Sequence, residues 1–374
     1  MNKKVIIFTS QLDINLLKFR LPVMMKLKEK DWHVVAMVPK GDYYKEFEKN
    51  NIDTYWVPIK RRSINPITEI ITLWEFYKGI KAIKPDIIHA FTIKPNIYAS
   101  FVSRLLGINK IITSITGLGA IYSTKTLKAK IMQVLLDTLY RLVGMFSNHV
   151  MFQNTDDLAH FINKRIVLED KTSCIKGSGI DTINWKKTTI NSEMPIRFIL
   201  IARLLRTKGI LDYCEAAKII KRKYLDQASF YLLGDVDAGN PDSLQRSDID
   251  PYITTNDITF LGWMDNIQEQ LQTTDIFVLP SYYREGIPRT GIEAASMSMP
   301  IITTNSIGCR ELVDDNINGI LVEPKCPDQV VTAMETFINH PELVTKMGEA
   351  SRKKAVHEFD IVKIIDQYIQ LYEK

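Results

Sequence analysis

The stretch SYYREGIPRTGIEAASMSMPIITTNSIGCRELVDD, from Ser281 to Asp315, indicates more about the fold than any other part of the chain. It carries two glutamates, Glu285 and Glu293. Asp275–Leu279 just upstream predicts a buried strand, so Glu285 lies on the loop at its carboxyl end and Glu293 on the next helix. Ligands of open α/β sheets bind at this end, and backbone N–H groups at a helix start favour anions. The stretch predicts a site for a phosphate flanked by hydroxyl-bearing rings.

Strand and helix patterns alternate along the whole chain. The strand candidates are Val5–Thr9, His33–Val38, Thr54–Pro58, Asp86–Phe91, Lys110–Ile115, His149–Gln153, Ile196–Ala202, Ser229–Gly234, Ile258–Leu261, Asp275–Leu279, Ile301–Thr304 and Ile320–Val322. The helix candidates lie near 15–30, 66–83, 95–106, 126–146, 155–163, 208–223, 265–273, 289–298 and 327–338. This alternation predicts parallel sheets covered by helices. Two series of strands predict an α/β fold of two facing, doubly wound, Rossmann-like domains with a cleft between them.

The boundary between the two domains is expected near 180–195, where Gly177, Gly179 and Pro195 interrupt the pattern. We therefore predict a first domain over 1–185 and a second over 186–356. The remaining residues, 357–374, predict one more amphipathic helix that crosses back to the first domain.

Composition is that of an ordinary globular chain of 374 residues, with 45% hydrophobic and 24% charged residues. The start, MNKKVIIFTS, is too short and strand-like for a signal peptide, and no apolar run is long enough to predict a membrane span. The four cysteines lie far apart, as is typical of reduced thiols in a cytoplasmic protein.

Charge is distributed unevenly along the chain. Residues 1–185 hold 27 lysines and arginines against 16 aspartates and glutamates, a net charge of +11, whereas residues 186–374 have a net charge of −6. A basic first half indicates an anionic partner, either a nucleic acid or an anionic membrane surface. The alternative is a set of scattered, solvated lysines.

Two cations follow the first strand of the second half, in the sequence ARLLRTKG. They are Arg203 and Lys208, and Lys208 opens the following helix. Cations beside a helix start at the carboxyl end of a parallel sheet suit a diphosphate, although a solvated basic turn would give the same sequence. The glutamate loop at a neighbouring strand end favours the diphosphate site.

The spacing of Glu285 and Glu293 alone indicates nothing, because such pairs arise by chance. The context is informative: Gly286 allows a close backbone approach to a ligand, and the Thr290 hydroxyl can donate to a phosphate oxygen. Carboxylates accept from vicinal hydroxyls. No second carboxylate stands at a spacing typical of a hydrolase, so a two-carboxylate hydrolase is not predicted.

Taken together, these motifs resemble the retaining nucleotide-sugar glycosyltransferases of the GT-B architecture, group 1 and family 4-like, in their bacterial surface-polysaccharide branch. The resemblance spans nearly the whole chain. It rests on the two glutamates, the Arg203 and Lys208 pair, and three further stretches: Lys84–Asn96 (KPDIIHAFTIKPN), Ser114–Ala120 (SITGLGA) and Ile175–Asp181 (IKGSGID).

The resemblance implies a role for each matching residue. Arg203 and Lys208 hold the donor diphosphate and neutralise the leaving nucleotide, Glu285 contacts the donor sugar, and Glu293 accepts from the ribose. The remaining implied donor contacts are Gly286, Ile287, Pro288, Arg289 and Thr290, with Trp263 and Met264 beside the base. His89 reaches toward the transferred sugar, its alternative being a satisfied core histidine.

One loop departs from the family pattern. Ser10–Leu16 lacks the paired glycines that many members carry there, so its contacts cannot be carried over. Asp13, Asn15 and Lys94 are weaker candidates for acceptor or sugar contacts. Asp235-Val-Asp237 looks like a metal-binding motif, but we predict a surface loop with turn chemistry and no metal or other cofactor.

Two stretches combine cations with apolar residues. Residues 125–146 begin with Lys125, Lys128 and Lys130, and their apolar stripe includes Ile131, Leu135, Leu139 and Leu142. A second such stretch is Lys60-Arg61-Arg62 followed by 64–77. Helices of this kind can lie in a lipid interface, although we expect most of the apolar stripe to pack on the sheet. The basic first half predicts peripheral attachment to the anionic inner face of the cell membrane.

The predicted function is transfer of a hexose or N-acetylhexosamine from a nucleotide diphosphate sugar, a UDP-sugar, to a polyprenyl-diphosphate-linked saccharide. Retention of configuration without a metal is implied by the resemblance. One alternative is a nucleotide-sugar 2-epimerase, which needs acid and base groups around the sugar. Another is a non-enzymatic binder of anions such as nucleic acid; no aromatic and basic interleaving supports it, so nucleic acid is not an expected partner.

Overall fold

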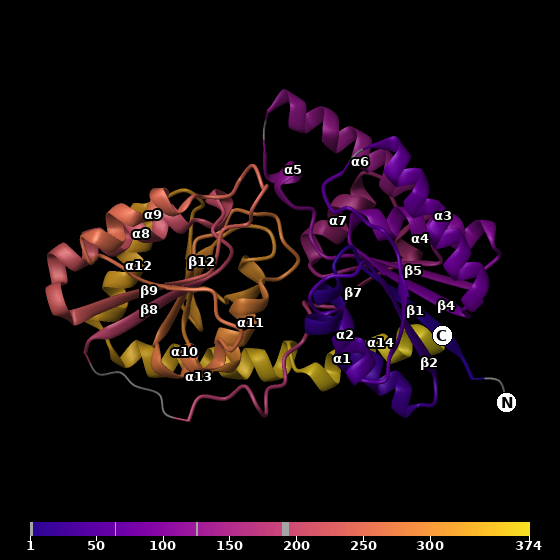
Figure 1. Cartoon of the computed structure of the whole chain (residues 1–374). Coiled ribbons are helices and arrows are strands. Elements are labelled where there is room, and N and C mark those ends of the chain that lie inside the picture. The colour runs from indigo at the N-terminus through magenta and orange to yellow at the C-terminus, as the bar shows by residue number, and fades with distance from the viewer. Residues whose placement is uncertain (1–2, 64, 125, 189–193) are drawn as a thin grey trace. The chain divides into compact units, whose positions relative to one another are not determined.

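The apolar strand runs of the sequence form two separate parallel sheets in a computed structural model of the chain (Figure 1). The structure describes residues 3–63, 65–124, 126–188 and 194–374. The chain divides into two units: the first unit comprises residues 1–178 and 361–374, and the second unit comprises residues 179–360.

The sheet of the first unit has seven strands in the order β3-β2-β1-β4-β5-β6-β7, and all neighbours are parallel. Runs such as VIIFT and HVVAMV are buried on both faces, as parallel sheets require. The strands are β1 (Val5–Thr9), β2 (His33–Val38), β3 (Asp53–Trp56), β4 (Ile87–Phe91), β5 (Lys110–Ile115), β6 (His149–Phe152) and β7 (Thr172–Cys174).

Helices cover both faces of this sheet, with α1 and α14 on one face and α3, α4 and α6 on the other (Figure 1). On the α14 side, Tyr372 meets Phe8 of β1 edge-on, with 6.0 Å between ring centroids. The helices of the first unit are α1 (Asp13–Glu29), α2 (Tyr44–Lys49), α3 (Pro66–Ile83), α4 (Ile93–Leu105), α5 (Ala120–Ser123), α6 (Leu127–Phe146), α7 (Thr155–Asn163), the 3₁₀ turn η1 (Glu169–Lys171) and α14 (Ile361–Glu373).

The sheet of the second unit has six parallel strands in the order β10-β9-β8-β11-β12-β13. The rings of Phe198 and Phe230, on neighbouring central strands, are stacked with 5.2 Å between their centroids. The strands are β8 (Ile196–Ile201), β9 (Ala228–Leu233), β10 (Thr259–Gly262), β11 (Ile276–Leu279), β12 (Ile301–Thr304) and β13 (Gly319–Val322). The helices are α8 (Ile210–Tyr224), α9 (Arg246–Thr254), α10 (Gln268–Thr273), α11 (Arg289–Ser296), α12 (Pro327–Asn339) and α13 (Glu342–Glu358), with 3₁₀ turns η2 (Arg206–Lys208), η3 (Leu225–Gln227) and η4 (Arg310–Leu312).

Strand order reverses direction once in each sheet. In the first unit the reversal lies between β1 and β4, and in the second unit between β8 and β11. At such a reversal the loops after the two strands leave toward opposite faces and open a crevice at the carboxyl ends of the strands. The fold therefore directs attention to the loops after β1, β4, β8 and β11.

Every strand predicted from the sequence is present, and the structure adds β7 (Thr172–Cys174) at the edge of the first sheet. That strand has only three half-buried residues, too few for a recognisable pattern. The units separate between Ser178 and Gly179, earlier than the predicted boundary, because the N–H of Ile180 donates to the carbonyl of Phe359 at 2.8 Å. The expected single helix over 357–374 is instead the end of α13 followed by α14, and α14 packs against α1 of the first unit.

Candidate active site

Lys208 lies at the point where the strand order of the second sheet reverses. It ends η2, which follows β8, and its side chain is only 10% exposed. Its Nζ lies 2.6 Å from Oε1 of Glu285, which is carried by the loop after β11. The same carboxylate oxygen accepts from the Ser281 hydroxyl at 3.2 Å, and Nζ lies 5.6 Å from the centre of the Tyr283 ring. The predicted cation and the predicted glutamate are thus direct partners across the crevice.

Gly209 fixes the position of Lys208. Its φ of +71° is left-handed, and an added Cβ would lie 2.2 Å from the carbonyl oxygen of Pro280. A second backbone contact joins the same two loops, because the N–H of Tyr282 donates to the carbonyl of Thr207 at 2.9 Å. Both loops are therefore held in register by backbone groups.

The loop that carries Glu285 also packs closely against the segment that carries Gly308. Gly308 has a φ of +85°, and an added Cβ would lie 2.4 Å from the carbonyl oxygen of Gly286. The neighbouring Cys309 is fully buried, and burial raises the pKa of its thiol, so the thiol stays neutral near Glu285. This thiol is enclosed by the protein and packs under the Glu285 loop.

The start of α11 brings the second glutamate to the same edge. Oε1 of Glu293 accepts from Nε of Arg289 at 2.8 Å, and the Arg289 guanidinium also donates to the carbonyl of Gly179. Ile287 is buried in the core of the second unit. The Thr290 hydroxyl donates to the carbonyl of Ile201 at 3.1 Å, so in this structure it supports β8.

Arg203 has a partner that the sequence did not indicate. Its NH1 donates to Oδ2 of Asp237 at 2.6 Å, and its side chain is 38% exposed. Asp237 belongs to the stretch that we predicted to be a surface loop, yet its carboxylate is mostly buried against the arginine. Trp263 and Met264 follow β10, with Trp263 exposed and Met264 half-buried.

The interpretation of His89 as a sugar contact was wrong. The residue lies inside β4 and is fully buried. Its Nδ1 is 2.6 Å from the Tyr372 hydroxyl, and its Nε2 is 2.6 Å from the Ser114 hydroxyl. Burial, with a contribution from Arg20, lowers the pKa of the imidazole well below its usual value, so it is neutral. The alternative, a satisfied core histidine, is what the structure contains.

The three weaker candidates of the first unit have structural partners. Asp13 accepts from the backbone N–H of Tyr43 at 2.9 Å and is buried. The Asn15 amide lies 3.4 Å from the Ser10 hydroxyl. The Lys94 ammonium donates to the carbonyls of Lys60 and Ser63 and to Glu69 at 2.7 Å, which uses its three N–H groups.

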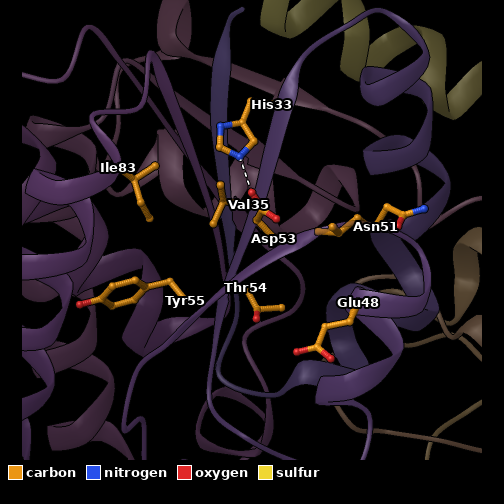
Figure 2. A pocket seen from close by; sticks show the side chains of 9 residues that line it. His33, Val35, Glu48, Asn51, Asp53, Thr54, Tyr55 and Ile83 are labelled. Atoms are coloured by element: carbon orange, nitrogen blue, oxygen red, sulfur yellow. Dashed lines mark hydrogen bonds and ion pairs between the residues drawn. The ribbon is translucent and has the colours of Figure 1, made fainter.

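A hollow in the first unit lies near the amino-terminal ends of β2 and β3, away from the carboxyl ends of the strands. It is lined by His33, Val35, Glu48, Asn51, Ile52, Asp53, Thr54, Tyr55 and Ile83 (Figure 2). His33 and Asp53 are the first residues of β2 and β3, and their side chains are 2.7 Å apart. Because ligands of such sheets bind at the carboxyl ends of strands, this hollow is not the expected substrate site.

Within the described residues there is no group of three or more His, Cys, Asp or Glu side chains placed to hold a metal ion. The same residues include no helix long and apolar enough to cross a membrane.

Two family models match the chain, and between them they cover most of it. The model of glycosyl transferases group 1 matches residues 181–354, and the glycosyl transferase 4-like model matches residues 6–154. The chain is a glycosyltransferase, and its second half matches the group 1 model. Arg203, Lys208, Glu285 and Glu293 all lie in the part of the chain that the group 1 model matches.

Named relatives of this glycosyltransferase resemble it over most of their length. The N,N'-diacetylbacillosaminyl-diphospho-undecaprenol alpha-1,3-N-acetylgalactosaminyltransferase of Campylobacter jejuni is 25% identical, over 98% of each chain. The UDP-Gal:alpha-D-GlcNAc-diphosphoundecaprenol alpha-1,3-galactosyltransferase of Escherichia coli is 26% identical, over 87% of this chain and 85% of the relative.

Solved structures confirm the predicted fold class of this glycosyltransferase as GT-B. A glycosyltransferase from Rickettsia africae superposes with a TM-score of 0.78 at 20% identity, covering 100% of this chain and 98% of the other. Anabaena Alr3699/HepE, solved with UDP, superposes with a TM-score of 0.79 at 17% identity over 99% of each chain. At such identities the likeness shows the fold alone.

Proposed function

We propose that this glycosyltransferase moves a hexose or N-acetylhexosamine from a UDP-sugar to a polyprenyl-diphosphate-linked saccharide, with retention and without a metal ion. The observation that carries the proposal is the Lys208–Glu285 pair at the β8/β11 reversal, with a nitrogen–oxygen distance of 2.6 Å. An ammonium suited to a phosphate and a carboxylate suited to sugar hydroxyls lie side by side in this pair, which supports the proposal.

The negative charge of the donor diphosphate changes the partners of Lys208 and Glu285. A nucleoside diphosphate brings an anion to Lys208, and Glu285 then becomes available to accept from sugar hydroxyls. As the sugar leaves, negative charge develops on the diphosphate, and cations fixed in advance stabilise it. Arg203 and Lys208 supply two such charges without requiring a divalent ion. The acceptor hydroxyl then attacks the anomeric carbon from the face that the departing diphosphate occupied and gives its proton to that diphosphate, so configuration is retained.

The donor and acceptor are proposed from the relatives. The name of the Escherichia coli relative specifies a UDP-sugar, and both relatives are named for diphospho-undecaprenol saccharides. The epimerase alternative receives no support from the structure, because His89 is buried with both ring nitrogens occupied. Epimerisation of the sugar ring would need an acid or a base beside the ring, and the buried His89 is not available for that role.

The first unit offers a surface for the lipid part of the acceptor. Large apolar side chains are exposed along α3, α4 and α6, and Phe101 of α4 meets Phe146 of α6 with 5.7 Å between ring centroids. The exposed residues are Ile67, Ile70, Ile71, Trp74, Phe101, Leu105, Leu127, Ile131, Val134, Leu135, Leu142 and Met145. We had expected most of the α6 stripe to pack on the sheet, and that expectation was wrong for Ile131, Leu135 and Leu142.

Cations border this apolar surface. Lys128 and Lys130 are exposed on α6, Arg104 is exposed on α4, and Lys60 and Arg62 precede α3. Lys125, also expected here, lies outside the described residues. Apolar insertion together with attraction of cations to anionic headgroups is the usual basis of interfacial binding. We therefore propose peripheral attachment through α3, α4 and α6 to the inner face of the cell membrane.

Transfer is tested by supplying the purified protein with UDP-sugars and undecaprenyl-diphosphate saccharides, and measuring UDP release and the anomer formed. A product with retained configuration, formed in the presence of a chelator, supports the proposal. Product formed from donor alone would instead support an epimerase.

Membrane attachment is tested by flotation with vesicles of anionic phospholipid. Ile131→Asp should reduce the bound fraction, whereas Ile317→Asp is a matched control, because both side chains are 62% exposed and Ile317 lies in the second unit. Equal binding of the two variants would contradict the assignment of this surface.

A further inference from the structure

The two aspartates of the Asp235-Val-Asp237 stretch have different surroundings. Asp235 is exposed, and its Oδ1 accepts only from the adjacent N–H of Val236, at 2.7 Å, among the described contacts. Asp237 turns inward, its side chain is 12% exposed, and its Oδ2 accepts from NH1 of Arg203 at 2.6 Å. The motif that resembles a metal site is therefore divided between a solvated carboxylate and one that contacts a proposed donor-binding cation.

The loop that carries Asp237 is joined to the loop that carries Arg203 by backbone hydrogen bonds. The N–H of Leu204 donates to the carbonyl of Asp235 at 2.9 Å, and the N–H of Leu244 donates to the carbonyl of Leu204 at 2.8 Å. Further along, Oδ2 of Asp242 accepts from the N–H of Thr207 at 3.1 Å. The segment that follows β9 thus braces the segment from Arg203 to Thr207.

Asp237 is itself fixed before any ligand arrives. Oδ2 also accepts from Nδ2 of Asn240 at 2.9 Å, and the backbone N–H of Asp237 donates to the Ser243 hydroxyl at 3.0 Å. A carboxylate held in this way restricts the long side chain of Arg203, whose rotamer freedom would otherwise be lost on binding. A guanidinium has five N–H groups, so the bond to Asp237 leaves others for a second anion.

We propose that Asp237 is a positioning residue that holds the Arg203 guanidinium in place for the donor diphosphate. Asp237 acts through Arg203 and does not touch the donor. This inference rests on the proposed function, in which Arg203 contacts the diphosphate. It assigns to the loop after β9 a part in donor binding that neither the metal interpretation nor the surface-loop interpretation gave it.

The test is calorimetric binding of UDP to the full chain and to two matched variants. Asp237→Asn keeps the shape of the side chain and removes its charge, and Asp235→Asn makes the same change two residues away. We expect Asp237→Asn to weaken UDP binding by about two- to tenfold, the cost of ordering on binding an arginine side chain that Asp237 no longer holds. Asp235→Asn should bind as the unchanged protein does. Tighter UDP binding by Asp237→Asn would overturn the inference, because Asp237 would then compete with the diphosphate.

A double-mutant cycle separates positioning from a general structural role. In an Arg203→Ala background, Asp237→Asn should cause no further loss of UDP affinity, because the residue through which it acts is gone. A second, additive loss would overturn the inference. If Asp237→Asn does not fold, Ser243→Ala can replace it, because it removes the hydroxyl that accepts from the backbone N–H of Asp237. We expect Ser243→Ala to cause a smaller loss of UDP affinity. If the unchanged protein binds neither UDP nor another nucleoside diphosphate, the proposed function itself fails; if only the variants behave unexpectedly, the positioning role alone fails.

Discussion

The two sheets reverse their strand order in the same way, but the polar residues at the two reversals have different partners. At the β8/β11 reversal, Lys208 and Glu285 pair with each other through side chains, and an anionic, hydroxyl-bearing ligand can replace both partners. At the β1/β4 reversal, Asp13 accepts from backbone, Lys94 is fully occupied by two carbonyls and Glu69, and His89 is buried inside the core. Topology thus provides an equivalent position twice, and the choice of side-chain partners decides which position is open to a ligand.

We expect the largest effect for a change at Glu285, the glutamate of the β8/β11 reversal. Glu285→Gln should reduce the rate of sugar transfer by about 10²–10³-fold, a range typical of losing one preorganised polar group in an active site. The measurement is UDP release with donor and acceptor. Glu335→Gln is a matched control, because it removes a Lys–Glu pair of 2.7 Å in the same unit, with Lys223 largely exposed. A similar loss of transfer rate in both variants would contradict the assignment of Glu285 to the active site.

A second prediction compares two left-handed glycines, one in each unit. Gly209→Ala and Gly107→Ala both place a side chain at a φ near +70°, which costs about 1 kcal/mol. Only at Gly209 does the added Cβ meet backbone, and we expect about 2 kcal/mol of further destabilisation from that overlap. Calorimetric unfolding measures both variants. Equal losses would contradict the tight contact between the β8 and β11 loops.

His89→Gln should separate stability from activity. It leaves the buried hydroxyls of Tyr372 and Ser114 poorly matched, and the free energy of unfolding should fall by about 1–3 kcal/mol. The transfer rate per folded molecule should stay unchanged, because the imidazole has no access to a ligand. Denaturant unfolding and initial-rate assays provide the two readouts. A large fall in rate without loss of stability would restore His89 to the site.

The smallest expected effect is a pH dependence of stability in the first unit. The folded pKa of His89 lies well below the usual value near 6.5, so the unfolded chain binds its proton first as the pH falls. The stabilisation is complete above about pH 6.5 and is lost on acidification below it, by at most about 1.4 kcal/mol per pH unit. His89→Gln should flatten the fall in unfolding free energy, leaving a contribution from His149, whose pKa burial also lowers. An unchanged slope would contradict this assignment.

The sequence alone determined the two-sheet α/β architecture and the cationic and glutamate loops of the proposed donor site. The signal was strong because buried parallel strands must be continuous apolar runs, and because a loop after such a strand must lie at the carboxyl edge. Thr172–Cys174 gave no comparable signal, since three half-buried residues carry no periodicity.

Only the tertiary structure decided which polar residues are engaged and by what. His89 and Glu285 both follow apolar runs in sequence, yet one is enclosed by Tyr372 from the far end of the chain and the other pairs with Lys208. Asp235 and Asp237 are equivalent in sequence and opposite in burial. Hydrogen-bond partners are set by contacts between segments distant along the chain, and no local pattern of residues records them.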